Sequence, residues 1–303
     1  MKIFFAVDGS QAASQAVKQV SGWLCDQTDA AAFYFAPPDV QIRHAHEAEA
    51  MRERARKAIA DAVFSDVRGC LSGNLALGAK TIIAEHTPTE GILLEAEKWS
   101  ADMIVVGARG LSQLDKLLLG SVADGVAQNS TRPVLVVRPR DESHADAPLK
   151  VLYAYDGSKS CTAALRMAEQ LHFPAGTQVL ALTVIESYSC GQMPSWILNK
   201  ARSADVEAMG ATWQREHDDE KRQARDQLTE FMAKQSAPFD KAEVEVAEGH
   251  AAEEILRITA ERGIDLIVMG VRGRNLLERL LIGSNSDKVL THAPCSVLLA
   301  RDA

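Results

Sequence analysis

The amino-acid sequence predicts an α/β protein made of two tandem domains, each with a parallel β-sheet covered by helices on both faces. Three observations support this prediction. The chain contains the same motifs twice, apolar runs alternate with helical patterns in each copy, and a glycine directly follows the most apolar run of each copy. Strands that alternate with helices form parallel sheets, and strands buried on both faces read as near-continuous apolar runs.

The internal repeat is visible at three places in the chain. Ala6-Val7-Asp8-Gly9-Ser10 recurs as Ala154-Tyr155-Asp156-Gly157-Ser158. The apolar run that begins at Asp102 recurs at Asp265, and Gly120-Ser121 recurs as Gly283-Ser284. The two copies are offset by 148 residues at the first motif and by 163 at the other two, so the second copy carries about 15 extra residues. We place the extra residues near 190–210.

A polar segment bounded by Pro139 and Pro148 separates the copies and is typical of a linker. We therefore expect one domain at 1–140, a linker at 141–148 and a second domain at 149–303.

Strands and helices are expected in the same order in both copies. A serine follows the first strand of each copy, at Ser10 and Ser158, and is a candidate N-cap for a helix with one apolar face. Long charged helices are expected at about 45–65 and 205–235. The strands are expected, in matching pairs, at 2–7 and 149–155, 31–36 and 178–185, 80–84 and 242–247, 103–106 and 266–269, and 133–137 and 294–299.

Composition and charge argue against several functional classes. Hydrophobic residues make up 47% of the chain and charged residues 24%, as in a globular protein with a sizeable core. The formal net charge of −8 argues against nucleic acid and membrane surfaces as partners. No run approaches the roughly 18 apolar residues of a spanning helix. The 5 cysteines are odd in number and scattered, which favours a cytoplasmic location over a disulfide framework or a zinc site.

The glycine spacing late in each copy indicates a phosphate cradle. Gly107 and Gly110 are followed, after nine residues, by Gly120-Ser121, and the second copy repeats this spacing. Residues without a Cβ let a phosphate lie against backbone N–H donors, and the start of a helix after Gly120 favours an anion. A single occurrence is most simply a strand-to-helix turn, but two occurrences at matching places favour binding. The pattern is neither a Walker P-loop nor the dinucleotide-binding fingerprint.

These motifs resemble the universal stress protein family, specifically its ATP-binding branch, whose signature is Gly-x2-Gly-x9-Gly-Ser/Thr. The Val-Asp-Gly-Ser after the first strand, and the Gly-Ser-Val-Ala that precedes a Pro-Val-Leu-Val-Val strand, are also similar to that family. The resemblance covers nearly all of both copies. It implies two tandem Rossmann-like domains of the adenine nucleotide alpha hydrolase-like type, each a five-stranded parallel sheet of order 3-2-1-4-5. Strands one and four then meet at a topological switch point, where a crevice opens at their carboxyl ends.

The resemblance also implies which residues contact an adenine nucleotide. Asp8 and Asp156 would lie beside the adenosine. The floor under the base would be formed by Ala6, Val7, Ala154 and Tyr155. The phosphates would be held in the first copy by Gly107, Gly110, Gly120, Ser121 and Val122, and in the second by Gly270, Gly273, Gly283, Ser284 and Asn285. Asn285 replaces the family's usual valine. Arg109 and Arg272 lie inside the cradle and either pair with phosphate oxygens or are solvated loop residues.

The expected function is that of an ATP-binding regulatory module in stress response. The ligand would be ATP, AMP or another adenine nucleotide, with or without Mg²⁺. The family's dimers meet through the last strand, so Val134–Val137 and Val297–Leu299 are expected near the contact of an intrachain pseudo-dimer. The identity of a protein partner, and whether two chains form a homodimer, are left open. No nucleophile with an adjacent base can be assembled, so no catalytic residue and no metal ligand is assigned. Two alternatives remain: a slow ATPase, and a partner-binding scaffold with one or both nucleotide sites vestigial.

Overall fold

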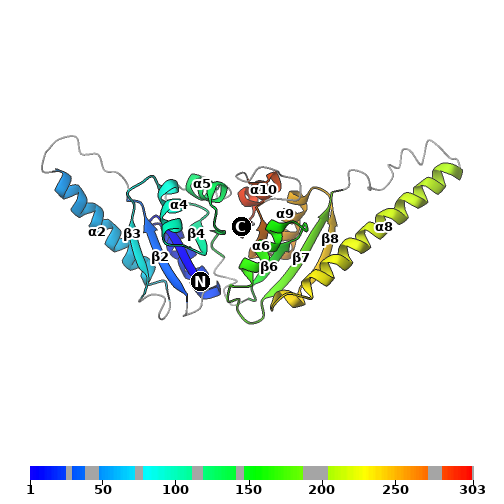
Figure 1. The fold of residues 1–303 in the computed structure, drawn as a ribbon, viewed down its shortest axis with the longest axis horizontal. Coiled ribbons are helices and arrows are strands. Elements are labelled where there is room, and N and C mark those ends of the chain that lie inside the picture. Colours follow the sequence, from blue (N-terminus) through cyan, green and yellow to red (C-terminus); the bar gives the residue numbers. More distant parts are fainter. Residues whose placement is uncertain are drawn as a thin grey trace.

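Ten strands form one continuous sheet that runs through both copies of the repeat (Figure 1). The computed structural model describes residues 1–24, 29–37, 48–71, 78–110, 119–140, 147–186, 204–271 and 282–301. The strand order is β3-β2-β1-β4-β5-β10-β9-β6-β7-β8. Each half therefore has the expected order 3-2-1-4-5, and the two halves meet through their last strands. The expected linker lies mostly outside the described residues.

The predicted strands are all present, with ends within two residues of those expected. The first half contains β1 (Lys2–Val7), α1 (Gln11–Leu24), β2 (Ala30–Phe35), α2 (Ala48–Arg68), β3 (Lys80–Ile83), α4 (Pro88–Lys98), β4 (Met103–Gly107), α5 (Ser121–Asn129) and β5 (Val134–Val137). The second half contains β6 (Lys150–Ala154), α6 (Lys159–Ala168), β7 (Gln178–Ile185), α8 (Ala204–Met232), η2 (Phe239–Lys241), β8 (Glu243–Glu248), α9 (Ala251–Arg262), β9 (Leu266–Gly270), α10 (Ser284–His292) and β10 (Ser296–Ala300).

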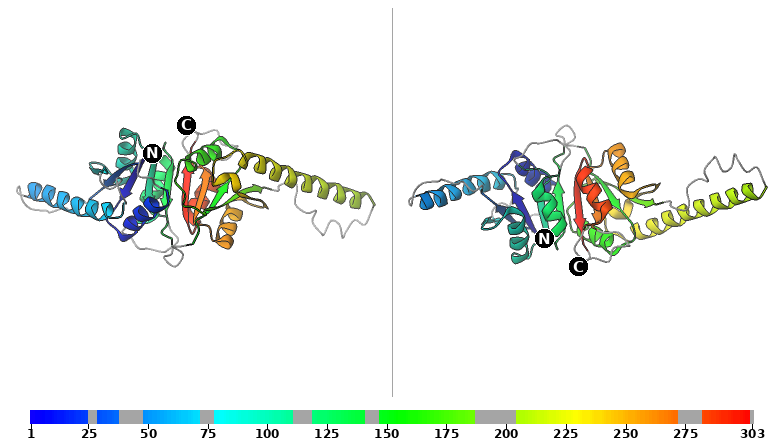
Figure 2. Two further views of the ribbon diagram at one scale, coloured as in Figure 1. Left: turned by 90° about the horizontal axis from the view of Figure 1, so that it is seen from below. Right: turned by 90° about the horizontal axis from the view of Figure 1, so that it is seen from above.

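The second copy is longer partly because one of its helices is longer. Helix α8 has 29 residues, against 21 in its counterpart α2. Both views of Figure 2 show these two helices extending toward opposite ends of the molecule. Residues 187–203 lie outside the described part of the chain, so only this share of the extra length is located. None of the described helices is both long and apolar enough to cross a membrane.

Two apolar cores cover the two faces of the sheet, and each core extends through both halves. Neighbouring strand residues point to opposite faces, so Phe5 belongs to one core and Phe4 to the other. Helices α1, α2, α6 and α8 contribute to the first core, and α4, α5, α9 and α10 to the second. The cores are therefore organised by sheet face and not by copy of the repeat.

The halves are joined by antiparallel pairing of β5 with β10. Val297 pairs with Val136, Leu298 with Leu135 and Leu299 with Val134, and all of these side chains are buried. An apolar edge strand left open would pair with another chain, so each half covers the edge of the other. Antiparallel pairing of the same strand from two similar units agrees with an approximate two-fold axis. The expectation that these strands lie at the contact is confirmed.

Shortening Leu298 to Ala should lower the free energy of unfolding by about 2–5 kcal/mol, because a fully buried leucine leaves a cavity. Leu135→Ala should cost a similar amount, and the double variant should cost less than the sum because the two residues are direct partners. Urea denaturation measures these differences. Since the cores cross the junction, we expect one cooperative transition. Separate transitions for the two halves, with additive losses, would contradict the shared core.

Candidate functional site

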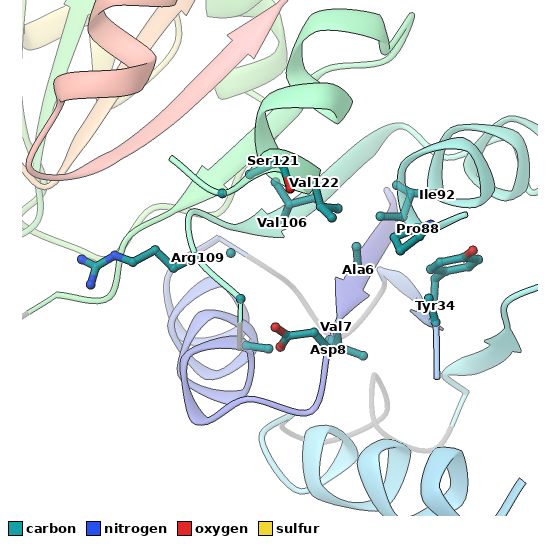
Figure 3. A pocket seen from close by; sticks show the side chains of 16 residues that line it. Ala6, Val7, Asp8, Tyr34, Pro88, Ile92, Val106, Arg109, Ser121 and Val122 are labelled. Carbon is teal, nitrogen blue, oxygen red and sulfur yellow. The ribbon is translucent and has the colours of Figure 1, made fainter. Parts of the chain in front are cut away.

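A cavity of about 360 Å³ opens where β1 and β4 end (Figure 3). The chain leaves these neighbouring strands in opposite directions, toward β2 and β5, which creates a topological switch point. The cavity lies where the two sequence motifs of the first copy meet. Its lining residues are Ala6, Val7, Asp8, Ala13, Tyr34, Ala36, Pro88, Ile92, Val106, Gly107, Arg109, Gly110, Gly120, Ser121, Val122 and Ala123.

One end of the cavity is formed by the glycine loop and the start of α5. Gly107 ends β4, and Gly120 is the N-cap of α5. The Gly120 N–H donates to the Ala108 carbonyl oxygen at 2.8 Å, which brings the two parts of the loop together. A Cβ on Gly120 would lie only 3.3 Å from that oxygen. No described side chain caps the helix, so the N–H groups of its first turn can donate to an anion.

Asp8 is held at the side of this cavity by the start of α1. Its Oδ1 accepts from the Ser10 N–H at 3.0 Å and from the Ser10 hydroxyl at 2.6 Å. Ser10 Oγ accepts from the Ala13 N–H at 3.1 Å, so Ser10 caps α1 as the sequence predicts. A Cβ on Gly110 would lie 2.7 Å from Asp8 Oδ2, so a larger residue there would have to displace the carboxylate. Asp8 is therefore oriented between the two motifs.

The other end of the cavity is apolar. Tyr34 from β2 and Pro88 and Ile92 from α4 lie together there, across the cavity from Ser121 (Figure 3). Burial raises the pKa of Tyr34 to about 12, so its side chain stays neutral. Its hydroxyl has no hydrogen-bond partner among the described residues. A flat ligand group could therefore pack here against Ala6 and apolar side chains.

Several residues of this cavity were missed by sequence reasoning. Ala13, Ala36 and Val106 are apolar residues in ordinary core patterns, and no sequence signal distinguishes them from other core residues. Pro88 opens α4 and carries a helix-start signal, but nothing in the sequence places that helix beside β1. Topology alone brings these residues to the cavity.

Arg109 lines the rim of the cavity, but its side chain does not point into it. In Figure 3 its guanidinium extends away from Asp8, Val7 and the apolar end. The other residues expected in the first copy lie around the cavity. They are Ala6, Val7, Asp8, Gly107, Gly110, Gly120, Ser121 and Val122.

The matching crevice of the second copy has a different shape. Arg272 and Gly273 lie outside the described residues. The deep part, lined by Ala154, Tyr155, Asp156, Gly270 and Asn285 among others, holds only about 90 Å³. A second, polar hollow of about 650 Å³ lies between α8 and the start of α10. Gly283, Ser284 and Asn285 are among its lining residues.

Several side chains that line the deep part of the second crevice are larger than their counterparts, although Tyr34 and Pro88 correspond to the smaller Leu182 and Ala251. At the positions that correspond through the repeat, Ala13 is replaced by Cys161, Ala36 by Val184 and Val106 by Met269. Val7 and Ala123 likewise become Tyr155 and Ser286.

Helix α6 also lies closer to its sheet than α1 does. A Cβ on Gly270 would lie 2.6 Å from the Cys161 backbone nitrogen and from Ser160 Oγ. At Gly107, the nearest atom to such a Cβ is the Arg109 carbonyl oxygen of its own loop, at 3.1 Å. The Tyr153 hydroxyl donates to the Cys161 carbonyl oxygen at 3.0 Å and holds the helix start against the sheet.

Acidic side chains surround the mouth of the second crevice. Asp156, Glu186 and Glu220 line the larger hollow. Glu186 Oε1 accepts from the Ala251 N–H at the start of α9 at 3.4 Å, and from Asn285 Nδ2 at 3.5 Å. Glu186 thus lies between the starts of α9 and α10, and its negative charge at the crevice mouth would repel a polyphosphate.

Known proteins of similar sequence share one family. A Mycolicibacterium smegmatis universal stress protein is 28% identical over 253 residues, which is 84% of this chain and 79% of that protein. Universal stress protein Slr1230 of Synechocystis is 29% identical over 212 residues, which is 69% of this chain and 61% of that protein.

Solved structures show the same fold over the whole chain. A universal stress protein from Archaeoglobus fulgidus superposes with a TM-score of 0.59 at 20% identity, covering 100% of this chain and 96% of that one. A putative universal stress protein from Pseudomonas aeruginosa gives a TM-score of 0.57 at 16% identity, covering 99% and 92%. The model of the universal stress protein family matches residues 1–138 and again 149–301. The chain therefore belongs to the universal stress protein family and contains two regions that match its model.

Proposed function

We propose that the first half of this protein binds ATP, or another adenine nucleotide, and that the protein acts in stress response as a nucleotide-responsive binding module. The observation that supports this most directly is the polarity of the 360 Å³ cavity. One end is apolar and the other is a glycine loop at a helix N-terminus. An adenine nucleotide has the same polarity, with an apolar base at one end and phosphates at the other.

The lining residues suggest how the nucleotide would lie. The base would pack among Ala6, Val106 and Ile92, with the ring of Tyr34 beside it. The Asp8 carboxylate would accept from a ribose hydroxyl, which is the role of the acidic residue in dinucleotide-binding folds. The phosphates would then reach the N–H groups at Gly110 and at the start of α5. Any Mg²⁺ in the site would be held by the phosphates themselves.

We propose that the second half does not bind a nucleotide in the same way. Ligand cavities usually enclose about 300–1,000 Å³, a range that includes the first cavity. In the second half, the deep part that would take the base holds only about 90 Å³, and the adjoining hollow of about 650 Å³ is polar and lies beside α8. Glu186, whose Oε1 also accepts from Asn285 Nδ2 in the first turn of α10, adds a negative charge at the mouth of this crevice. The sequence left open that one or both nucleotide sites are vestigial. The difference between the two crevices favours a single vestigial site, in the second half.

Replacing Gly120 by Val should weaken ATP binding by tenfold or more. The branched side chain would crowd the Ala108 carbonyl oxygen and cover the helix N-terminus. Gly283→Val is a matched control, because Gly283 is the N-cap of α10 with a similar backbone conformation. It should leave ATP affinity unchanged. Titration calorimetry on variants with wild-type circular dichroism measures both. Equal loss from the two variants, or no loss from Gly120→Val, would exclude this assignment of the site.

Turnover of ATP should be slower than about 1 s⁻¹, the lower end of the usual enzyme range. The proposed cradle consists mainly of backbone N–H groups, which hold the ground state and the transition state about equally and so do not raise turnover. Asp8 is held by Ser10 at the side of the cavity and is assigned to the ribose. A phosphate-release assay with Mg²⁺ or Mn²⁺ measures the rate. Faster turnover that disappears in Asp8→Ala, Arg109→Ala or Gly120→Val would instead favour an ATPase.

A further inference from the structure

Helix α5 carries the proposed phosphate contacts at its start, and an arginine from the other half contacts its end. Arg301 follows β10, and its Nη2 donates to the Ala127 carbonyl oxygen at 3.3 Å and to the Gln128 carbonyl oxygen at 2.6 Å. Both carbonyls belong to the last turn of α5. The carbonyl groups of a last turn have no partner within the helix, so a guanidinium there satisfies acceptors that would otherwise face solvent.

The first half supplies an equivalent arginine to α10 of the second half. Arg138 follows β5, and its Nη2 donates to the carbonyl oxygens of Leu290 at 2.9 Å and Thr291 at 3.2 Å, in the last turn of α10. Arg138 and Arg301 are 163 residues apart, the same offset as between the glycine motifs. Each half therefore supplies an arginine to the helix that follows the glycine loop of the other half. Helices α5 and α10 flank the junction on the same side of the molecule (Figures 1 and 2).

The length of α5 makes this contact relevant to the cavity. With 9 residues, the helix is only about 14 Å long at 1.5 Å per residue. Isolated helices shorter than about 12–15 residues are marginally stable, so the position of α5 depends on its packing and on contacts at its ends. A cation at the end of a helix and an anion at its start also both match the direction of the helix dipole.

We propose that Arg301 is a positioning residue for phosphate binding in the first half. It does not reach the nucleotide. It holds the end of α5, and thereby keeps the N–H groups at Ser121 and Val122 in place around the cavity. This inference rests on the proposed function of the first half. It gives the second half a part in that function, because the arginine comes from the second half even if its own crevice stays empty.

The contact also predicts coupling between the ligand and the junction. Phosphate binding that requires a fixed α5 should strengthen the contact of Arg301 with α5, since coupling between two binding events is reciprocal. The β5–β10 pairing and the Arg301 contact lie on the same edge of the second half, so ATP should stabilise the junction as well as the first half.

The test compares Arg301→Ala with Arg138→Ala, each titrated with ATP and with adenosine. Arg301→Ala should weaken the affinity for ATP about three- to tenfold. It should leave the affinity for adenosine unchanged, because adenosine has no phosphate to reach α5. Arg301→Lys, which keeps a cation near the carbonyls, should recover part of the loss. Arg138→Ala is the matched control: it removes the equivalent contact from α10 and should leave ATP affinity in the first half unchanged.

Amide hydrogen exchange without ligand tests the contact itself. Arg301→Ala should speed exchange in α5 and not in α10, and Arg138→Ala should do the reverse. If wild-type protein binds ATP but Arg301→Ala binds it equally well, the positioning role is wrong and the proposed function stands. Equal losses for ATP and adenosine would also overturn the positioning role, because they would indicate general damage to the cavity. If wild-type protein binds neither ligand, both proposals fail.

Discussion

The antiparallel pairing of β5 with β10 is the interaction on which the rest of this structure depends. Each of these strands would otherwise be an exposed apolar edge, and their pairing turns two five-stranded sheets into one sheet of ten strands. It carries both apolar cores through the junction. It also brings Arg138 and Arg301 to the ends of α10 and α5, respectively. The helices that follow the two glycine loops are thereby tied to the same junction.

The two halves share this framework but differ in their crevices, and both side-chain size and the position of α6 contribute to the difference. Small residues such as Ala13 and Val106 leave a cavity in the first half, whereas Cys161 and Met269 fill the corresponding space in the second. The Tyr153 hydroxyl, at a position that is Phe5 in the first half, holds α6 against the sheet. The copies can therefore keep one fold while only one keeps a cavity large enough for a nucleotide.

The sequence was sufficient to predict the strands and the two motifs, because these depend on local patterns and on a repeat, whereas the strand order followed from the family resemblance. Gly110 and Ser10 are examples: a close approach and a helix cap each leave a sequence signal. The apolar lining of the cavity left none, since Ile92 and Tyr34 have the same pattern as any core residue. The unequal crevices also could not be predicted, because the motif glycines are the same in both copies and the difference lies in side-chain volume and helix position. The contact of Arg301 with α5 joins residues far apart in sequence, so only the folded chain shows it.

The central claim is that the chain has one working nucleotide site, in its first half. Native mass spectrometry across a titration with ATP tests it most directly, because it counts ligands bound to each chain. We expect a single ATP on the protein over the range in which the first site saturates, with a second appearing only at concentrations that give nonspecific binding. Two ATP molecules bound with similar affinity would contradict the claim, and would show that the second crevice opens to accept a nucleotide.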